Sequence, residues 1–235
     1  MMDVLTLTPD ESRALWLSVK VAFWCVLLSL LPAIGLAWLM ARVSFWGKSI
    51  VEALILLPMV LPPVVPGYLL LLFFGQQGLG GQLLAKIGIV LPFHWTGAVV
   101  ASMVMSVPLF VQPIRLAMQG IDRRTEQAAR LLGAGPWRVF LTMTLPLSAA
   151  GVLTGAVLAF GRSLGEFGAT ISFVGNIDGQ TRTLPLAIYS AIQQPNGEQM
   201  AMRLVILSML LAFAALWISH LISQRQQRRL GLSDV

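Results

Sequence analysis

Arg162 and Glu166 are ionisable residues spaced one helical turn apart, in a stretch of small and apolar residues that also contains Ser163. Side chains four positions apart share one face of a helix, so the two could form an internal salt bridge. A cation among small residues could instead attract a tetrahedral dianion on a path through the protein. Since Glu166 would repel such an anion, the salt bridge is the favoured interpretation. A translocation path that includes Arg162, Ser163 and Glu166 is the alternative.

Two other patterns, a possible phosphate-binding loop and a possible metal site, lack residues at the spacing that each would need. The tripeptide Gly47–Ser49 reads Gly-Lys-Ser, but a phosphate-binding loop needs a glycine where Arg42 stands, and it needs a buried strand before it. His94 and His220 lie far apart and lack cysteine or carboxylate neighbours at ligand spacing. The sequence therefore predicts no ATP site, no metal site, no cofactor and no catalytic residue in this chain.

The elements that carry these residues are apolar enough to cross a membrane. The chain has 235 residues, of which 57% are hydrophobic and 11% charged, and its mean hydropathy is +0.80. A bilayer span needs about 20 apolar residues. We therefore expect an all-α integral membrane protein that forms a single domain over residues 1–235. Five spans are expected, near 15–40, 50–74, 95–118, 138–161 and 201–222.

The basic residues indicate how these spans are oriented. Cytoplasmic loops carry an excess of Lys and Arg. With an outside N-terminus, ten basic residues face inside and four face outside. The inner ten are Arg42, Lys48, Arg115, Arg123, Arg124, Arg130, Arg138, Arg225, Arg228 and Arg229, and the outer four are Arg13, Lys86, Arg162 and Arg182. We expect an outside N-terminus, an inside C-terminus and no contact with nucleic acid, despite the net charge of +6.

The second expected span cannot be a regular helix, because it contains Pro58, Pro62, Pro63 and Pro66. Proline lacks a backbone N–H, and unpaired carbonyls in lipid cost several kcal/mol each. This segment should therefore face other helices or a water-filled cavity, and Pro62 and Pro63 are candidates for a transport path. A kink that only shapes packing is the alternative.

Between the third and fourth spans lies a charged loop, residues 120–137, on the expected cytoplasmic side. Asp122 is suited to cap a short helix, Gly133 and Gly135 can end it, and Pro136 can begin the next. Ala128 and Ala129 give this helix a face with little side-chain bulk, which suits insertion into a partner's groove. An amphipathic helix that lies on the inner leaflet is the alternative.

The loop also resembles a known motif. Gln127-Ala128-Ala129, then Gly133 after three residues and Leu145-Pro146 after a further gap, resembles the E-A-A loop of permease subunits of bacterial ATP-binding-cassette importers. Gln127 and Met143 replace the glutamate and the isoleucine of that pattern. The resemblance implies that an ATPase subunit contacts this loop. The implied coupling residues are Glu126, Gln127, Ala128, Ala129, Leu132 and Gly133.

Two longer stretches, residues 39–75 and 162–189, resemble the permeases of molybdate, tungstate and sulfate importers. The resemblance implies the type I importer permease fold (MetI-like), with a short cytoplasmic coupling helix. It also implies a homodimer in the bacterial inner membrane, two ATPase subunits that bind ATP and magnesium, and a periplasmic molybdate-binding protein. The expected function is ATP-driven import of molybdate, or of tungstate. The alternatives are a sulfate or thiosulfate permease and an ATPase-independent secondary carrier.

Overall fold

The computed structural model describes the backbone of residues 7–229 and the side chains of residues 7–218 and 221. Every regular element in this part of the chain is helical. The elements are α1 (Pro9–Arg42), α2 (Lys48–Val60), α3 (Val64–Phe74), α4 (Leu79–Ala85), α5 (Trp95–Gln119), α6 (Arg123–Leu131), α7 (Pro136–Val139), the π-helical turn η1 (Phe140–Thr144), α8 (Leu145–Leu147), α9 (Ala149–Leu164), α10 (Gly168–Val174), α11 (Leu184–Ile192) and α12 (Glu198–Arg229). The side chains of His220, Arg225, Arg228 and Arg229, which the sequence analysis used, lie outside the described residues.

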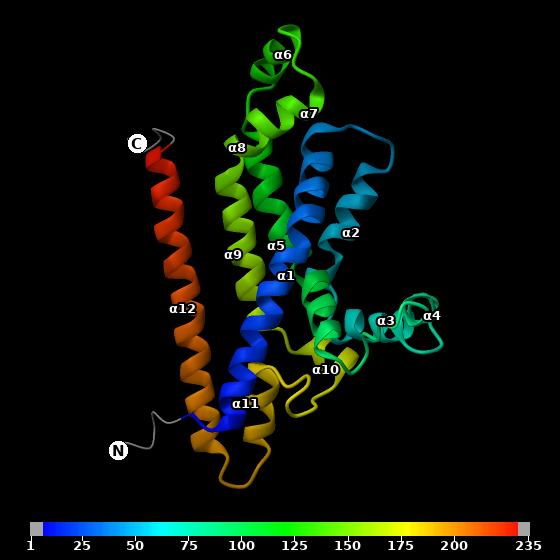
Figure 1. Cartoon of the computed structure of the whole chain (residues 1–235), viewed down its shortest axis with the longest axis vertical. Coiled ribbons are helices and arrows are strands. Elements are labelled where there is room, and N and C mark those ends of the chain that lie inside the picture. The colour runs from blue at the N-terminus through cyan, green and yellow to red at the C-terminus, as the bar shows by residue number, and fades with distance from the viewer. Residues whose placement is uncertain (1–6, 230–235) are drawn as a thin grey trace.

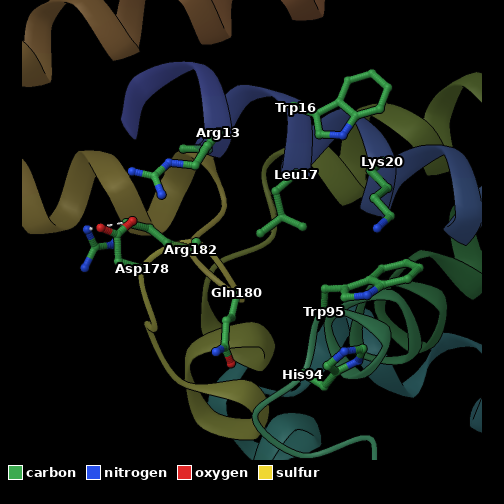
Figure 2. Close-up of a pocket in the computed structure, with 11 residues that line it drawn as sticks. Arg13, Trp16, Leu17, Lys20, His94, Trp95, Asp178, Gln180 and Arg182 are labelled. Carbon is green, nitrogen blue, oxygen red and sulfur yellow. Dashed lines mark ion pairs between the residues drawn. The ribbon is translucent and has the colours of Figure 1, made fainter. Parts of the chain in front are cut away.

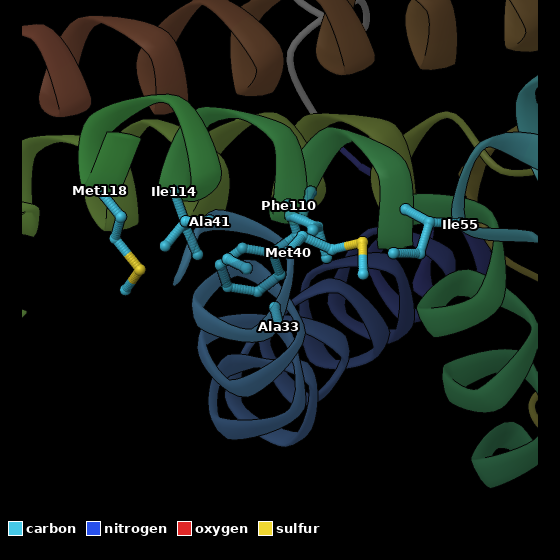
Figure 3. Close-up of a cluster of buried hydrophobic side chains, with 10 residues drawn as sticks. Ala33, Met40, Ala41, Ile55, Phe110, Ile114 and Met118 are labelled. Atoms are coloured by element: carbon cyan, nitrogen blue, oxygen red, sulfur yellow. The ribbon is translucent and has the colours of Figure 1, made fainter. Parts of the chain in front are cut away.

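Three long helices, α1, α5 and α9, pack side by side and form the centre of a bundle (Figure 1). Figure 3 shows part of the core between them, where Met40 of α1 lies beside Phe110 and Ile114 of α5, all fully buried. Three helices are long and apolar enough to cross a membrane: α1, α5 and the Glu198–Ile218 part of α12. Two bent helix pairs bring the number to five if each counts as one span. This agrees with the predicted number.

Small residues let α9 approach α5 closely. A β-carbon placed on Gly151 would lie 2.6 Å from the carbonyl oxygen of Pro113, and one on Gly155 would lie 2.6 Å from that of Phe110. Lipid tails are as apolar as the side chains of a membrane helix, so the hydrophobic effect does not drive such helices together. They associate instead through close packing, which small residues such as Gly and Ala permit. The α5–α9 contact is therefore a rigid part of the bundle.

Two breaks interrupt the outer helices. The axes of α2 and α3 differ by 112° across residues 61–63, where Pro62 and Pro63 remove two backbone donors. The segment Pro136–Leu147 meets α9 at 66°, after the π-helical turn η1 and Pro146. Proline and π-turns are established causes of helix kinks. The sequence predicted the first break but not the second.

Residues 162–200, which separate the expected fourth and fifth spans, contain two short helices. α10 packs against α3 and α5, and α11 packs against α12 and α1. Both lie at or near the end of the bundle where α1 begins, whereas α6 and α7 lie at the opposite end, together with the last described turns of α12 (Figure 1). The structure thus separates the charged loop from the Arg162–Glu166 segment by most of the length of α9.

Candidate coupling and transport site

The short helix α6 forms as the sequence predicted. The Asp122 carboxylate caps it by accepting a hydrogen bond from the Arg124 N–H at 2.9 Å. Its C-terminal end is closed by Gly133, whose φ of 87° is left-handed, and by a hydrogen bond from the Ala134 N–H to the Ala129 carbonyl at 3.1 Å. Glycine adopts this conformation at little steric cost. Pro136 then stands at the first position of α7.

One face of α6 is open to solvent. Gln127, Ala128 and Gly133 are exposed, and the side chains of Leu131 and Leu132 are 88% and 90% exposed. Ala129 is half-buried. Two almost fully exposed leucines at the tip of a charged helix form an apolar contact surface that has no partner within the described chain.

Glu126 lies on the other face of the same helix and is buried, with 8% of its surface exposed. Its Oε1 atom accepts two hydrogen bonds, one from the Arg42 guanidinium and one from the Thr144 hydroxyl, both at 2.8 Å. We call Arg42, Glu126 and Thr144 the clamp. The clamp joins the end of α1, helix α6 and the turn η1. Sequence reasoning grouped Glu126 with the docking residues, but the structure directs it into the bundle.

Two further contacts reinforce the clamp. The Arg42 guanidinium also donates to the Ile121 carbonyl, and the Arg123 guanidinium donates to the Ala41 carbonyl, each at 3.3 Å. The segment before α6 and the end of α1 therefore exchange side-chain-to-backbone bonds in both directions. Sequence analysis missed the roles of Arg42 and Thr144. Arg42 was used there to exclude a phosphate-binding loop and to mark orientation, and Thr144 occupies the unspecified position of the Met143–Pro146 motif.

At the other candidate site, Arg162 and Glu166 form the expected ion pair, with 2.7 Å between Nη1 and Oε2. Glu166 is 2% exposed, and its Oε1 accepts the Ala169 N–H at 2.7 Å, which caps α10. The buried hydroxyl of Ser163 makes no hydrogen bond to any described residue. Charge attraction to Arg162 and the hydrogen bond from the Ala169 N–H offset the burial of this carboxylate. Its Oε2 atom receives no hydrogen bond from a described residue.

The structure brings this ion pair near the break between α2 and α3. A β-carbon on Gly168 would lie 2.6 Å from the Pro63 β-carbon, and one on Gly67 would lie 2.6 Å from the Ala169 carbonyl oxygen. The starts of α3 and α10 are thus in direct backbone contact. Among the predicted path residues, Pro63 takes part in this contact directly, through Gly168. Pro62 and Glu166 lie next to the contact in the sequence. We call this contact the α3–α10 junction.

The described residues offer no metal centre, because no three His, Cys, Asp or Glu side chains among them lie close enough to hold an ion. The ionisable groups of both sites are instead engaged in ion pairs and caps. Both sites are thus defined by ion pairs, helix caps and close backbone contacts.

Comparison with known families agrees with this geometry. Residues 33–228 match the family model described as "Binding-protein-dependent transport system inner membrane component". The chain belongs to this family, and its fold is the type I importer permease fold.

Among individual proteins, the chain is similar to the molybdenum transport system permease protein ModB of Escherichia coli K12. The two are 52% identical over 228 residues, which are 97% of this chain and 100% of the relative. Among solved structures, it resembles a chain of a bacterial ABC transporter that imports the acidic polysaccharide alginate. That match has a TM-score of 0.76 at 17% identity and covers 95% of this chain and 82% of the other. A second structure of an alginate ABC transporter, in complex with a periplasmic protein, has a TM-score of 0.72 at 19% identity and covers 100% of this chain and 84% of the other.

Proposed function

We propose that this chain is the membrane-spanning permease subunit of an ATP-driven importer of molybdate. The observation that carries the proposal is the 52% identity to a molybdenum transport permease over that protein's whole length. The exposed tip of α6 supports it, because an importer without an ATP site of its own needs a surface that a separate ATPase can grip.

We propose the following assembly. Two copies of the chain pair in the bacterial inner membrane, with the start of α1 on the periplasmic side. Each α6 enters a groove of a cytoplasmic ATPase subunit through Gln127, Ala128, Leu132 and their neighbours. A periplasmic protein delivers the oxyanion at the opposite end. The solved alginate importer in complex with its periplasmic protein supports this arrangement by analogy of fold.

The clamp gives the proposed coupling its mechanical basis. When the ATPase subunits close, they displace α6. Because Glu126 holds Arg42 and Thr144 in a poorly solvated site, α6 cannot move without displacing the end of α1 and the turn η1. A rigid element that transfers motion in this way is a recognised means of switching between two packed states.

We propose that the starts of α3 and α10 line the path at the α3–α10 junction. Broken helices whose ends meet within a bundle are typical of transport routes. Arg162 contributes positive potential on one side, while its bond to Glu166 keeps that charge from binding an anion tightly. Weak attraction favours passage, since strong binding slows release.

The test is to purify the chain with the ATPase subunits and the binding protein of its own transport system, and to reconstitute them in proteoliposomes. We expect molybdate-loaded binding protein to stimulate ATP hydrolysis and uptake of molybdate. Uptake driven by an ion gradient without ATPase subunits would contradict the proposal and support a secondary carrier. Stimulation by sulfate but not by molybdate or tungstate would favour the sulfate permease alternative.

A further inference from the structure

A cavity of about 440 Å³ lies at the end of the bundle where α1 begins, far from α6. Three parts of the chain line it: the first turns of α1, the His94–Trp95 start of α5, and the loop between α10 and α11 (Figure 2). None of the residues that line it belongs to the clamp or to the α3–α10 junction. The proposed function gives this cavity no task.

Cationic side chains are in excess around the cavity. Arg13, Lys20 and Arg182 line it. Two carboxylates oppose these three cations: Asp178 lies 3.5 Å from Arg182, and Asp10 pairs with Arg13 in a contact where both side chains are more than half exposed. Exposed pairs of this kind are weak. Arg13 can therefore reorient towards a stronger anionic partner at little cost. Arg182 is less exposed, at 28%, and is positioned by a hydrogen bond from its Nε to the Asn176 Oδ1 atom at 3.0 Å.

Lys20 is the cation that faces no carboxylate. Within the described residues it forms no salt bridge, and its ammonium lies 3.6 Å from the centroid of the Trp95 ring. Figure 2 shows this ammonium directed over the ring, with His94 next to Trp95 and with Gln180 between them and the two arginines. An ammonium has three donors, and contact with a ring face leaves donors free for an anion. His94 Nδ1 accepts the Thr96 N–H at 3.4 Å and lies 2.8 Å from the Thr96 hydroxyl. With Nδ1 as the acceptor, the ring proton is on Nε2, which can donate to an anion.

The position of the cavity along the bundle narrows the choice of ligand. Lys20 lies in the first turns of the expected span 15–40, and Trp16, which is 69% exposed, lines the same cavity as Trp95. Indole rings and lysines at the ends of a span mark the level of lipid headgroups. The lining also includes apolar groups, Ala14 and Leu17. A pocket with cations, free N–H donors and an apolar margin at this depth suits a phosphate ester or a similar tetrahedral oxyanion.

We propose that this cavity, the anion pocket, binds a tetrahedral oxyanion through Lys20, His94 and the two arginines. Two ligands have this chemistry: the phosphate of a phospholipid headgroup, and free molybdate. A carboxylate-bearing surface of another protein is disfavoured, because the pocket is concave and bordered by two indoles.

The chain allows a precise chemical test, because it contains three lysines, Lys20, Lys48 and Lys86. Lys86 is exposed and does not line the pocket, so it serves as an internal control. The full-length chain is purified in dodecylmaltoside, which contains no phosphate, and is washed free of lipid. The rate of acylation of each lysine by an N-hydroxysuccinimide ester is then measured by peptide mass spectrometry.

Short-chain phosphatidylglycerol, which has no amine, and sodium molybdate are added in separate arms. We expect at least one of them to slow acylation of Lys20 threefold or more while leaving Lys86 unchanged. The effective arm identifies the source. In Arg13→Gln the protection should fall at least twofold, whereas Arg138→Gln, at the other end of the bundle, should match the unchanged chain.

The proposal is overturned if neither compound slows acylation of Lys20, if Lys86 is protected equally, or if Arg13→Gln is protected as well as the unchanged chain. Protection by the periplasmic binding protein alone would also overturn it, and would assign the pocket to a protein contact. The labelling involves neither ATP nor uptake, so its outcome is independent of whether the importer assignment holds.

Discussion

At the scale of single residues, Glu126 is the buried side chain that fixes the inner face of α6 to the bundle. Its carboxylate is enclosed by the clamp, so Glu126→Ala leaves the Arg42 guanidinium poorly solvated without its anionic partner. Removing one member of a buried ion pair costs about 3–5 kcal/mol. We expect a clear fall in the thermal midpoint of the purified chain in detergent, and lower ATP-coupled transport at equal membrane abundance.

Three further variants, of which Asp10→Asn is the control outside the clamp, complete this test. Thr144→Val removes one hydrogen bond and should cost about 1 kcal/mol. Asp10→Asn breaks the exposed pair with Arg13 and should cost less than about 1 kcal/mol. The double variant Arg42→Met with Glu126→Leu should recover much of the stability lost in Glu126→Ala, because a buried pair can be replaced by apolar groups. Equal midpoints for Glu126→Ala and Asp10→Asn would contradict the role of the clamp.

Ala128 tests the opposite, exposed face. Ala128→Trp adds a large ring to the surface that we propose enters the ATPase groove, and it meets no described part of this chain. We expect unchanged stability of the isolated chain but at least a tenfold loss of transport, measured at matched abundance. Ala129→Trp is a poorer probe because Ala129 is half-buried.

The control for this prediction is Ser44→Trp, in the exposed loop between α1 and α2 at the same end of the bundle. Transport should survive this change. If Ala128→Trp transports as well as Ser44→Trp, α6 does not enter a closely fitting groove.

At the scale of elements, the end of α6 depends on one backbone conformation. A β-carbon on Gly133 would meet no atom within 4 Å, so only its φ of 87° opposes substitution. Gly133→Ala should therefore cost about 1–2 kcal/mol and increase hydrogen exchange of the last amides of α6. Gly161 of α9 has equal free space and no positive φ, so Gly161→Ala should leave exchange in its helix unchanged or slower. Equal responses of the two helices would refute the argument.

The α3–α10 junction depends on contact rather than on φ. Gly168→Ala places a methyl group 2.6 Å from the Pro63 β-carbon, well inside van der Waals separation, so α3 and α10 must move apart. Overpacking of this kind costs about 1–3 kcal/mol. We expect a lower thermal midpoint and altered transport, with Gly161→Ala as the control. Transport at the level of the unchanged chain would exclude the junction from the path.

At the scale of the whole molecule, features that depend on neighbouring residues were predictable. The Asp122 cap, the left-handed Gly133, the start of α7 at Pro136 and the break at Pro62–Pro63 all follow from local backbone chemistry. The Arg162–Glu166 pair was predictable for the same reason, because its partners are one helical turn apart.

Features that join distant segments were not predictable from one sequence. Arg42 and Glu126 are 84 positions apart, and the anion pocket gathers residues of α1, the start of α5 and the loop before α11. Nothing local to Arg42 distinguishes a clamp residue from a marker of orientation. The π-turn η1 was also missed, because the side chains of Phe140–Thr144 favour no such turn.

The final prediction concerns the side of the membrane on which each end of the helix bundle lies. Ser44 lies near α6, and Gln180 lies in the loop at the opposite end of the bundle. The positive-inside rule predicts that Ser44 lies in the cytoplasm and Gln180 in the periplasm. Since Cys25 is the one cysteine in the sequence, Cys25→Ala yields a chain without thiols, to which Ser44→Cys or Gln180→Cys can be added. In intact cells whose outer membrane has been made permeable, an inner-membrane-impermeant maleimide should label only the cysteine at 180, and lysis should expose the one at 44. The reverse pattern would place α6 in the periplasm, out of reach of any ATPase, and would refute the proposed function along with the orientation.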